Sequence, residues 1–233
     1  MKSPPQGGTV KSQSPQLEIT PELFQRQMEW LKRRGYQTVS LKQALGTPVE
    51  LPARPLVLTF DDGTLDFWQH ARPVLAACGF RATLFVVTGY VGGQSDWDRD
   101  LGEPARPLMS WGQLAELQRG GFEIGSHTHS HRPLTELSED EARSELVQSR
   151  RLLKRELGAA PEFLAYPRGF YRPEHMRLAR AAGYLGACAV ILRWRDLLRC
   201  DAFALRRMPI KGNEPMSRFK LRLRLSRAVP LVA

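Results

Sequence analysis

The chain has 233 residues, of which 42% are hydrophobic and 25% are charged. This balance is typical of a folded globular protein and argues against a disordered or fibrous chain. No apolar run approaches the roughly 18 residues that cross a bilayer, and no apolar stretch follows Lys2 as it would in a signal peptide. We therefore expect a cytoplasmic protein, or a chain from which a leader has been removed. The chain has three cysteines, Cys78, Cys188 and Cys200. Because their number is odd and their spacing is not that of a pair, they are predicted to be free thiols.

The net charge of +10 is concentrated toward the C-terminus. From Arg206 onward there are eight Lys and Arg residues against one acid, Glu214, so this part holds seven of the ten net charges. The rest is nearly balanced, which argues against a nucleic-acid partner. Residues 219–225 alternate apolar and basic side chains. This period of two predicts an edge strand, or equally a basic strip that faces an anionic membrane surface or an acidic glycan.

Three parts of the chain differ in character. Residues 1–17 are rich in Pro, Gly, Ser and Gln and are predicted to be disordered. A folded domain is expected over residues 18–212, and a basic tail over residues 213–233.

Capping and periodicity signals predict helices near residues 20–34, 40–45, 67–78, 111–119, 138–157 and 174–182. Strands are predicted at residues 37–39, 56–60, 83–87, 122–125, 163–166, 185–190 and 205–210. Such alternation predicts an α/β fold with a parallel sheet closed into a barrel.

Polar residues follow three of the predicted strands at the point where each ends. The first buried strand is followed by Asp61-Asp62-Gly63, the third by residues 126–131 (Ser-His-Thr-His-Ser-His), and the fourth by residues 167–169 (Pro-Arg-Gly). Because the carboxyl ends of parallel strands meet at one edge, these side chains are expected to converge there. The irregular stretch 89–110 exceeds the usual length of a loop and is expected to form a functional lip.

These residue types suit metal-assisted chemistry. Successive strand side chains diverge, so one of Asp61 and Asp62 can bind a metal while the other acts as a base. His127 and His131 are spaced i, i+4 and share a face if their segment is helical. An aspartate with two histidines is an established ligand set for zinc. In an extended segment, all three histidines would point one way instead. We expect His127 and His131 to bind and His129 to line the site, and we expect the other histidines on helix surfaces: His70 and His175.

The same residues resemble a known family. Thr59-Phe60-Asp61-Asp62-Gly63, followed by His127-Thr128-x-x-His131, is similar to the first two motifs of the polysaccharide deacetylases, and the likeness runs from about residue 20 to residue 210. Tyr166-Pro167-Arg168-Gly169 resembles the third motif of the branch that deacetylates biofilm-type poly-N-acetylglucosamine. The resemblance implies a distorted (β/α) barrel of about seven parallel strands. It also implies a divalent metal, usually zinc, with cobalt, nickel or manganese as alternatives.

Carried over by position, the resemblance makes Asp61 the general base and assigns three metal ligands: Asp62, His127 and His131. It implies metal-dependent removal of N-acetyl groups from N-acetylhexosamine units of a glycan or glycan precursor, in which metal-bound water attacks the amide carbonyl. The oxyanion would rest on the metal and on a backbone N–H near Arg168. The expected contacts to the substrate or the oxyanion are His129, Tyr166, Pro167, Arg168, Gly169 and Trp97.

Two positions depart from the family's pattern. The arginine that opens the third motif and orients the catalytic aspartate is replaced by Ala165, so Arg168 and Arg172 are candidates to supply its charge. The late histidine that carries the general acid has no counterpart after Cys188. Three groups remain as candidates for the acid: a metal-bound water, the protonated Asp61 and His129.

Other readings stay open. The barrel could hydrolyse a small non-glycan amide, or it could be catalytically degenerate and bind a glycan or a membrane surface. A cytosolic enzyme acting on a lipid-linked glycan precursor at the inner membrane would fit both the missing leader and the basic tail. Core packing and substrate contact remain alternatives for three aromatic residues: Trp111, Tyr171 and Trp194.

Overall fold

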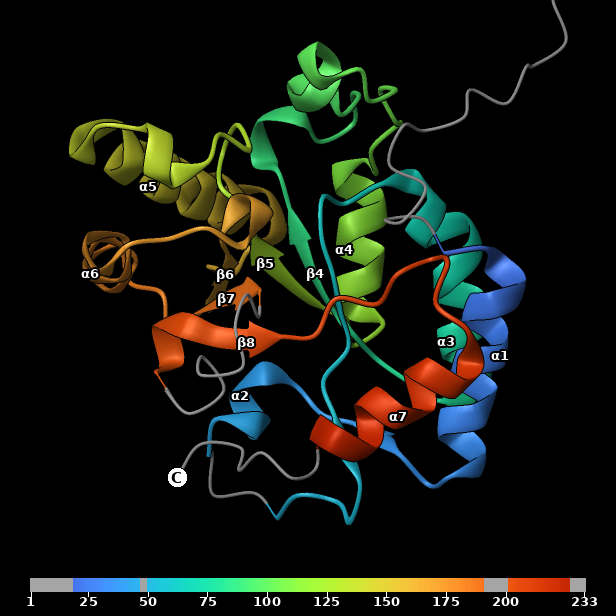
Figure 1. The fold of residues 1–233 in the computed structure, drawn as a ribbon. Helices are drawn as coiled ribbons and strands as arrows, with labels where there is room; N and C mark the ends of the chain where they lie inside the picture. The colour runs from blue at the N-terminus through green and yellow to red at the C-terminus, as the bar shows by residue number, and fades with distance from the viewer. Residues whose placement is uncertain (1–18, 47–49, 191–200, 227–233) are drawn as a thin grey trace, which may run out of the picture.

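The fold is a curled sheet of parallel strands with helices packed outside it (Figure 1). The computed structural model describes residues 19–46, 50–190 and 201–226, so the predicted disorder of residues 1–17 and the alternatives for Trp194 lie outside the described residues. The strands of the main sheet follow one another in chain order and are β3 (Thr59–Phe60), β4 (Thr83–Val86), β5 (Glu123–Ser126), β6 (Phe163–Ala165), β7 (Gly186–Val190) and β8 (Leu205–Arg207). A separate parallel pair is formed by β1 (Gln37–Thr38) and β2 (Pro55–Leu56).

The predicted parallel α/β barrel architecture is confirmed in the form of a curled half-barrel. Among the described residues the main sheet has six strands where about seven were expected. Each strand is parallel to its neighbour, so all the carboxyl ends lie along one edge. We call this edge the rim.

All the described helices except the last form where the capping and periodicity signals predicted them. They are α1 (Pro21–Arg33), α2 (Leu41–Ala44), α3 (Arg72–Cys78), α4 (Trp111–Arg119), α5 (Glu139–Leu157), α6 (Pro173–Ala181) and α7 (Met216–Ser226). At the start of α5, the Ser138 hydroxyl accepts a hydrogen bond from the Glu141 amide, and the Glu141 carboxylate accepts one from the Ser138 amide. The helix ends at Gly158, which takes a left-handed conformation that glycine adopts without strain.

Two predicted elements are divided in the structure. The strand expected over residues 56–60 is split into β2 and β3, because the Leu56 carbonyl accepts from Val39 whereas the Leu58 carbonyl accepts from Thr83. The chain therefore changes partner between these two residues. The helix expected over residues 67–78 begins with a π-type turn, Phe67–Ala71. Pro73 has no N–H to continue the ordinary ladder across this junction.

The C-terminal helix α7 replaces the edge strand that the alternating pattern predicted. Its residues are mostly Leu, Lys, Arg and Met, which favour helices, and it contains no β-branched residue. Phe219 and Leu223, one turn apart, are buried in the core, while Leu221 faces outward with 54% of its surface exposed. Trp30 of α1 packs edge-on against Phe219, with ring centroids 6.1 Å apart.

The largest apolar cluster lies between the sheet and helices α1, α3, α4 and α7. Its fully buried members include Leu31, Leu75, Leu84 and Leu114. All four helices contribute apolar side chains to this cluster, which therefore joins the outer helices to the sheet. No helix in the described part of the chain is long and apolar enough to cross a membrane.

Candidate metal centre and catalytic rim

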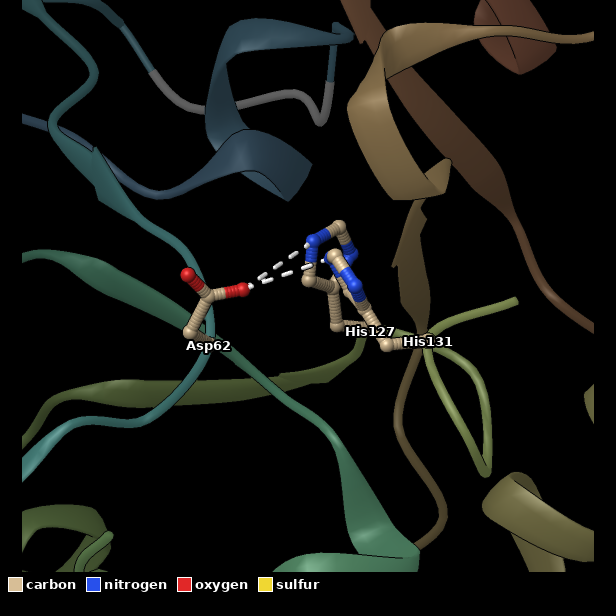
Figure 2. A group of neighbouring side chains, drawn as sticks. All are labelled: Asp62, His127 and His131. Carbon is tan, nitrogen blue, oxygen red and sulfur yellow. Dashed lines mark ion pairs between the residues drawn. The ribbon is translucent and has the colours of Figure 1, made fainter. Parts of the chain in front are cut away.

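Three potential metal ligands converge at the rim (Figure 2). Asp62 follows β3, whereas His127 and His131 lie on the loop after β5. Oδ1 of Asp62 is 3.6 Å from Nε2 of His127 and 3.5 Å from Nε2 of His131, and the donor atoms of all three residues lie within 4.8 Å of one another. The convergence that the strand ends predicted is therefore present.

The loop that carries the two histidines is a turn and not a helix. His127 continues β5, since its N–H donates to the Val86 carbonyl. Thr128 and His131 then take positive φ values of 66° and 64°, which reverse the chain and bring the His131 ring beside the His127 ring. The two ring centroids are 4.8 Å apart. The segment is neither helical nor extended, the two alternatives considered from the sequence, although the same two residues meet.

A close backbone contact fixes one side of this turn. The amides of Thr88 and Gly89, which follow β4, donate to the carbonyls of Thr128 and His129. A Cβ atom on Gly89 would lie 2.7 Å from the His129 carbonyl oxygen, closer than real contacts allow. The turn therefore depends on glycine at this position.

The hydrogen bonding of His127 sets its tautomer. Its Nδ1 lies 2.8 Å from the carbonyl oxygen of Ala165. A carbonyl can only accept, so Nδ1 carries the proton and Nε2 presents a lone pair toward Asp62. Metal-binding histidines commonly have this arrangement. On the other histidine, the Trp97 ring packs against the imidazole of His131 with centroids 4.8 Å apart.

The donor set fits a divalent metal. Ligand distances of about 2.0–2.2 Å in a tetrahedral zinc site place neighbouring donors roughly 3.3–3.6 Å apart, which is the spacing between Asp62 and each imidazole. Burial, His127 and Arg168 together lower the pKa of His131 to about 2, so this ring is neutral, as a metal ligand must be. Burial raises the pKa of Asp62 to about 6, although His127 opposes the rise and Asp61 adds to it. A cation bound beside Asp62 would favour the ionised form of its carboxyl group.

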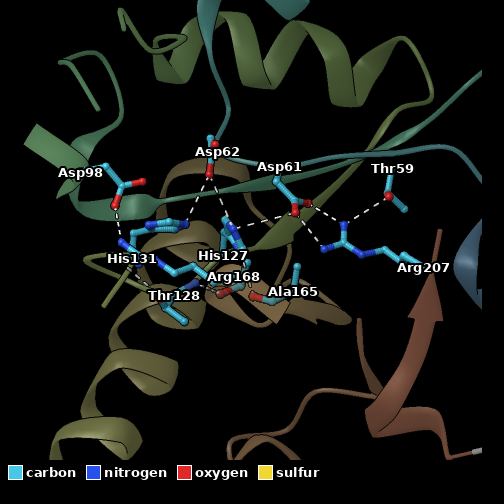
Figure 3. A network of polar contacts seen from close by, with 11 residues as sticks. Thr59, Asp61, Asp62, Asp98, His127, Thr128, His131, Ala165, Arg168 and Arg207 are labelled. Atoms are coloured by element: carbon cyan, nitrogen blue, oxygen red, sulfur yellow. Dashed lines mark hydrogen bonds and ion pairs between the residues drawn. The ribbon is translucent and has the colours of Figure 1, made fainter. Parts of the chain in front are cut away.

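The second carboxylate, Asp61, is held by an arginine that the sequence analysis missed (Figure 3). Arg207 of β8 donates to both of its oxygens, from Nη1 to Oδ1 at 2.6 Å and from Nη2 to Oδ2 at 2.8 Å. Nη1 also donates to the hydroxyl of Thr59 at 3.2 Å. Burial alone would raise the pKa of Asp61, but the guanidinium of Arg207 lowers it to about 2. Asp61 is therefore ionised, with Oδ2 4.0 Å from Nε2 of His127.

Neither arginine proposed from the sequence contacts Asp61. Arg168 pairs with Asp98 at 2.7 Å, and Arg172 lies 3.9 Å from Glu174. One feature of the sequence could have pointed to Arg207. It lies in the last predicted strand, and in a curled sheet the last strand comes close to the first one, which Asp61 follows.

Asp98, from the lip of residues 89–110, lies beside the site, where it accepts a hydrogen bond from Arg168 (Figure 3). Two isolated antiparallel β-bridges hold the lip in place. One joins Thr64 to Leu108 and the other joins Gln94 to Pro107. Trp97 packs between the rings of Tyr90 and His131.

The structure places the other predicted site residues as follows. Tyr166 is fully buried and its hydroxyl donates to the Phe203 carbonyl, so its side chain belongs to the core and not to a substrate-facing surface. Nδ1 of His129 lies 3.2 Å from the Thr88 hydroxyl. Pro167 and Gly169 lie in a 3₁₀ turn after β6. A Cβ on Gly169 would meet the Val190 side chain at 2.6 Å.

The remaining histidines differ from each other. His70 is exposed, as expected. His175 is buried, against the expectation of a surface position, because its Nδ1 accepts a hydrogen bond from the Arg172 amide at the start of α6. Tyr171 stacks on the buried Tyr166, with ring centroids 4.9 Å apart, and Trp111 packs against the largest apolar cluster.

The chain is similar to known deacetylases. YxkH of Bacillus subtilis, described as a polysaccharide deacetylase, is 31% identical over 171 residues, which are 72% of this chain and 57% of that protein. The poly-beta-1,6-N-acetyl-D-glucosamine N-deacetylase of Staphylococcus aureus is 25% identical over 71% of this chain and 58% of that protein. The chain thus spans little more than half the length of these relatives. The deacetylase PplD of Streptococcus pyogenes, solved in complex with acetate, superposes with a TM-score of 0.73 at 25% identity, covering 89% of this chain and 88% of that one.

The family model described as polysaccharide deacetylase matches residues 49–187. This range includes both carboxylates of the rim and the loop that carries His127 and His131. The resemblance inferred from the motifs is confirmed, and the chain belongs to the polysaccharide deacetylase family.

Proposed function

We propose that this protein is a metal-dependent hydrolase that removes N-acetyl groups from N-acetylhexosamine units of a glycan or glycan precursor. The observation that supports it most is the place of Asp61, an ionised carboxylate beside three convergent metal donors. Family membership supports the reaction class. The similarity to a poly-beta-1,6-N-acetyl-D-glucosamine N-deacetylase supports the class of substrate.

The metal would be held by Asp62, His127 and His131. One carboxylate and two imidazoles suit zinc best, and cobalt, nickel or manganese less well. When bound, the metal supplies a water of lowered pKa and polarises the acetamide carbonyl. Three protein ligands would leave a coordination position open for these groups.

Asp61 would act as the general base. Its carboxylate is ionised and is held in one orientation by two hydrogen bonds from Arg207. Each of its oxygens keeps a second lone pair, so it can accept a proton from the attacking water. The leaving amine then needs a proton, and we assign its return to the same carboxyl group. His129 is the weaker candidate because its ring contacts Thr88.

The lip would contribute to substrate binding. Trp97 offers an aromatic face beside His131, and Asp98 and Arg168 form an ion pair next to it. Sugar rings stack on aromatic faces, and their hydroxyl groups hydrogen-bond to charged side chains. The backbone amide of Arg168, in the turn after β6, remains a candidate to stabilise the oxyanion.

The test is acetate release from short N-acetylglucosamine oligomers, with zinc or cobalt added and with a chelator as control. Chelator-sensitive release that returns on adding metal would support the proposal. Release from small N-acyl amides but not from oligomers would favour hydrolysis of a non-glycan amide. A folded, metal-loaded protein that releases acetate from neither would contradict the proposed activity and favour a glycan-binding barrel.

We also propose that α7 contacts an anionic membrane surface. Opposite its buried face, the exposed Leu221 is flanked on the helix surface by the exposed Arg218 and Arg224. Basic residues around an exposed apolar one suit acidic lipid headgroups. The test is co-sedimentation with phosphatidylcholine vesicles with and without phosphatidylserine. Binding that requires phosphatidylserine and falls on replacing both arginines by glutamine is expected, and equal binding to both vesicles would contradict it.

A further inference from the structure

We infer that Glu145 of α5 is a positioning residue for the metal site, and that it acts by fixing the turn between His127 and His131. Glu145 is not one of the three donors, and it lies on the long helix that follows the turn. The inference rests on the proposed function, since it assigns a role in holding the proposed metal. Its basis is a set of hydrogen bonds that join this helix to the turn.

The Glu145 carboxylate accepts three hydrogen bonds from two consecutive residues of the turn. Oε2 accepts from the amide of His129 at 2.8 Å and from the amide of Ser130 at 2.8 Å. Oε1 accepts from the Ser130 hydroxyl at 2.5 Å. A carboxylate that accepts from backbone N–H groups forms stronger hydrogen bonds than a neutral acceptor does. Glu145 therefore ties the middle of the turn to a rigid helix.

The turn needs such a tie because its backbone is in an unfavourable conformation. Thr128 and His131 have positive φ values, and for a β-branched residue such as threonine this is a genuine outlier. Strained residues of this kind persist only where surrounding contacts determine them. The amides of His129 and Ser130 point to the same side as a result of this geometry, and Glu145 is the acceptor placed there.

A second contact from α5 supports the start of the turn. Ser149 lies one helical turn after Glu145, so both side chains project from one face of the helix. Its hydroxyl lies 2.7 Å from the Ser126 hydroxyl, which accepts from the Thr128 amide at 3.2 Å. Both serines are fully buried. One face of α5 thus holds the turn at Thr128 and again at Ser130.

The consequence concerns the distance between the two imidazoles. His127 is anchored by β5 and by the Ala165 carbonyl, whereas no hydrogen bond to another side chain is found for the ring of His131 within the described residues. The position of His131 is therefore set by its backbone, which the turn controls, together with the packing of its ring against Trp97. Loss of the hydrogen bonds that fix the turn should therefore let His131 move away from Asp62 and His127, and should lower the affinity of the site for a metal.

The test compares Glu145→Gln with the wild type and with Glu139→Gln. Glutamine keeps the size of the side chain but removes the charge and places an N–H₂ group among N–H donors. Glu139 is exposed on the same helix and serves as the matched control. The measurement is the dissociation constant for zinc and for cobalt alone, by competition with a chromophoric chelator. The thermal midpoint of the metal-free protein is recorded in parallel.

We expect Glu145→Gln to weaken metal binding by about 10- to 100-fold, the range found when a group supporting a metal ligand is lost, and Glu139→Gln to bind like the wild type. Amide hydrogen exchange at His129 and Ser130 should accelerate in the Glu145 variant. Unchanged metal affinity with a lower thermal midpoint would show a structural role alone and would overturn the inference.

The outcomes separate this inference from the proposed function. A wild-type protein that binds neither metal contradicts both the proposed metal dependence and the role of Glu145. A wild-type protein that binds metal and a Glu145→Gln variant that binds it equally well contradict the inference alone. If the Glu145 variant does not fold, Ser130→Ala removes only one of the three hydrogen bonds. A severalfold weaker metal affinity of Ser130→Ala would then support the inference, and unchanged affinity would overturn it.

Discussion

The rim and the apolar cluster under α1, α3, α4 and α7 use the same strands but are stabilised in opposite ways. Among the described residues, every non-glycine residue with positive φ follows a strand end at the rim: Asp62, Thr128, His131 and Arg168. Each such conformation costs on the order of 1–3 kcal/mol. The cluster is instead made of large apolar side chains such as Leu75 and Leu84, without exposed surface. Burial of the apolar cluster thus stabilises the folded state, and part of that stability offsets the cost of the strained backbone at the rim.

This contrast predicts that substitutions at the rim change chemistry first, whereas substitutions in the cluster change stability first. The largest effect is expected for Asp61→Asn. Loss of the base should lower the rate of acetate release by about 10²- to 10⁴-fold. Metal content should survive, because Asp61 is not one of the three donors. Steady-state kinetics with metal analysis checks this, and acetate release at the wild-type rate would remove Asp61 as the base.

In the cluster, Leu75→Ala is expected to have the largest effect on stability. Leu75 is fully buried on α3, and truncation of such a side chain lowers the free energy of unfolding by about 2–5 kcal/mol. Denaturant unfolding measures the loss. Metal affinity and turnover per folded molecule should stay as in the wild type. A fall in metal affinity at equal folded fraction would show that the two regions are not separable.

Replacing Arg207 by glutamine is expected to disorient the base without removing it. A misplaced catalytic group can lower the rate by on the order of 100-fold, so we expect kcat to fall toward that range while metal affinity is retained. The matched control is Arg72→Gln, since Arg72 lies on α3 away from the rim and pairs with Glu116 and not with Asp61. Equal kinetic losses in both variants would contradict a specific role for Arg207.

The smallest effect is expected at the lip. Asp98→Asn removes an ion pair with Arg168 that is partly exposed, with 28% and 39% of the two side chains accessible. Such pairs contribute about 0–1 kcal/mol, so the thermal midpoint should hardly change. If the lip contacts the glycan, KM for oligomers should rise severalfold at constant kcat. A change in kcat alone would place Asp98 in the chemistry and not in binding.

The convergence of Asp62 with His127 and His131 could be predicted because its signal is local. Asp62 and His127 each follow a strand, and the alternation of strands and helices implies that such ends meet. The conformation of the His127–His131 segment was not predictable, because its positive φ values depend on contacts from Gly89 and Glu145, which lie outside it.

Two other features were missed for physical reasons. Arg207 meets Asp61 across 146 residues of sequence, and that contact depends on how far the sheet curls, which no local pattern encodes. The strand expected over residues 219–225 followed from an alternating pattern, but helix propensity and the burial of Phe219 and Leu223 decided the outcome. Local alternation is weak evidence when the residues themselves favour helices.

The bidentate contact between Arg207 and Asp61 also bears on how the barrel is completed. Strands β3 and β8 are the two edges of the main sheet in the described residues, and the ladder order does not join them. Arg207, at the end of β8, donates hydrogen bonds to Thr59 of β3 and to Asp61, which follows β3. The Arg207 guanidinium therefore links the two edges of the curled sheet, which backbone hydrogen bonds do not join. Asp61, the proposed base, is itself part of this link. A change that alters the contact between the two edges of the sheet will therefore also alter the orientation of the base.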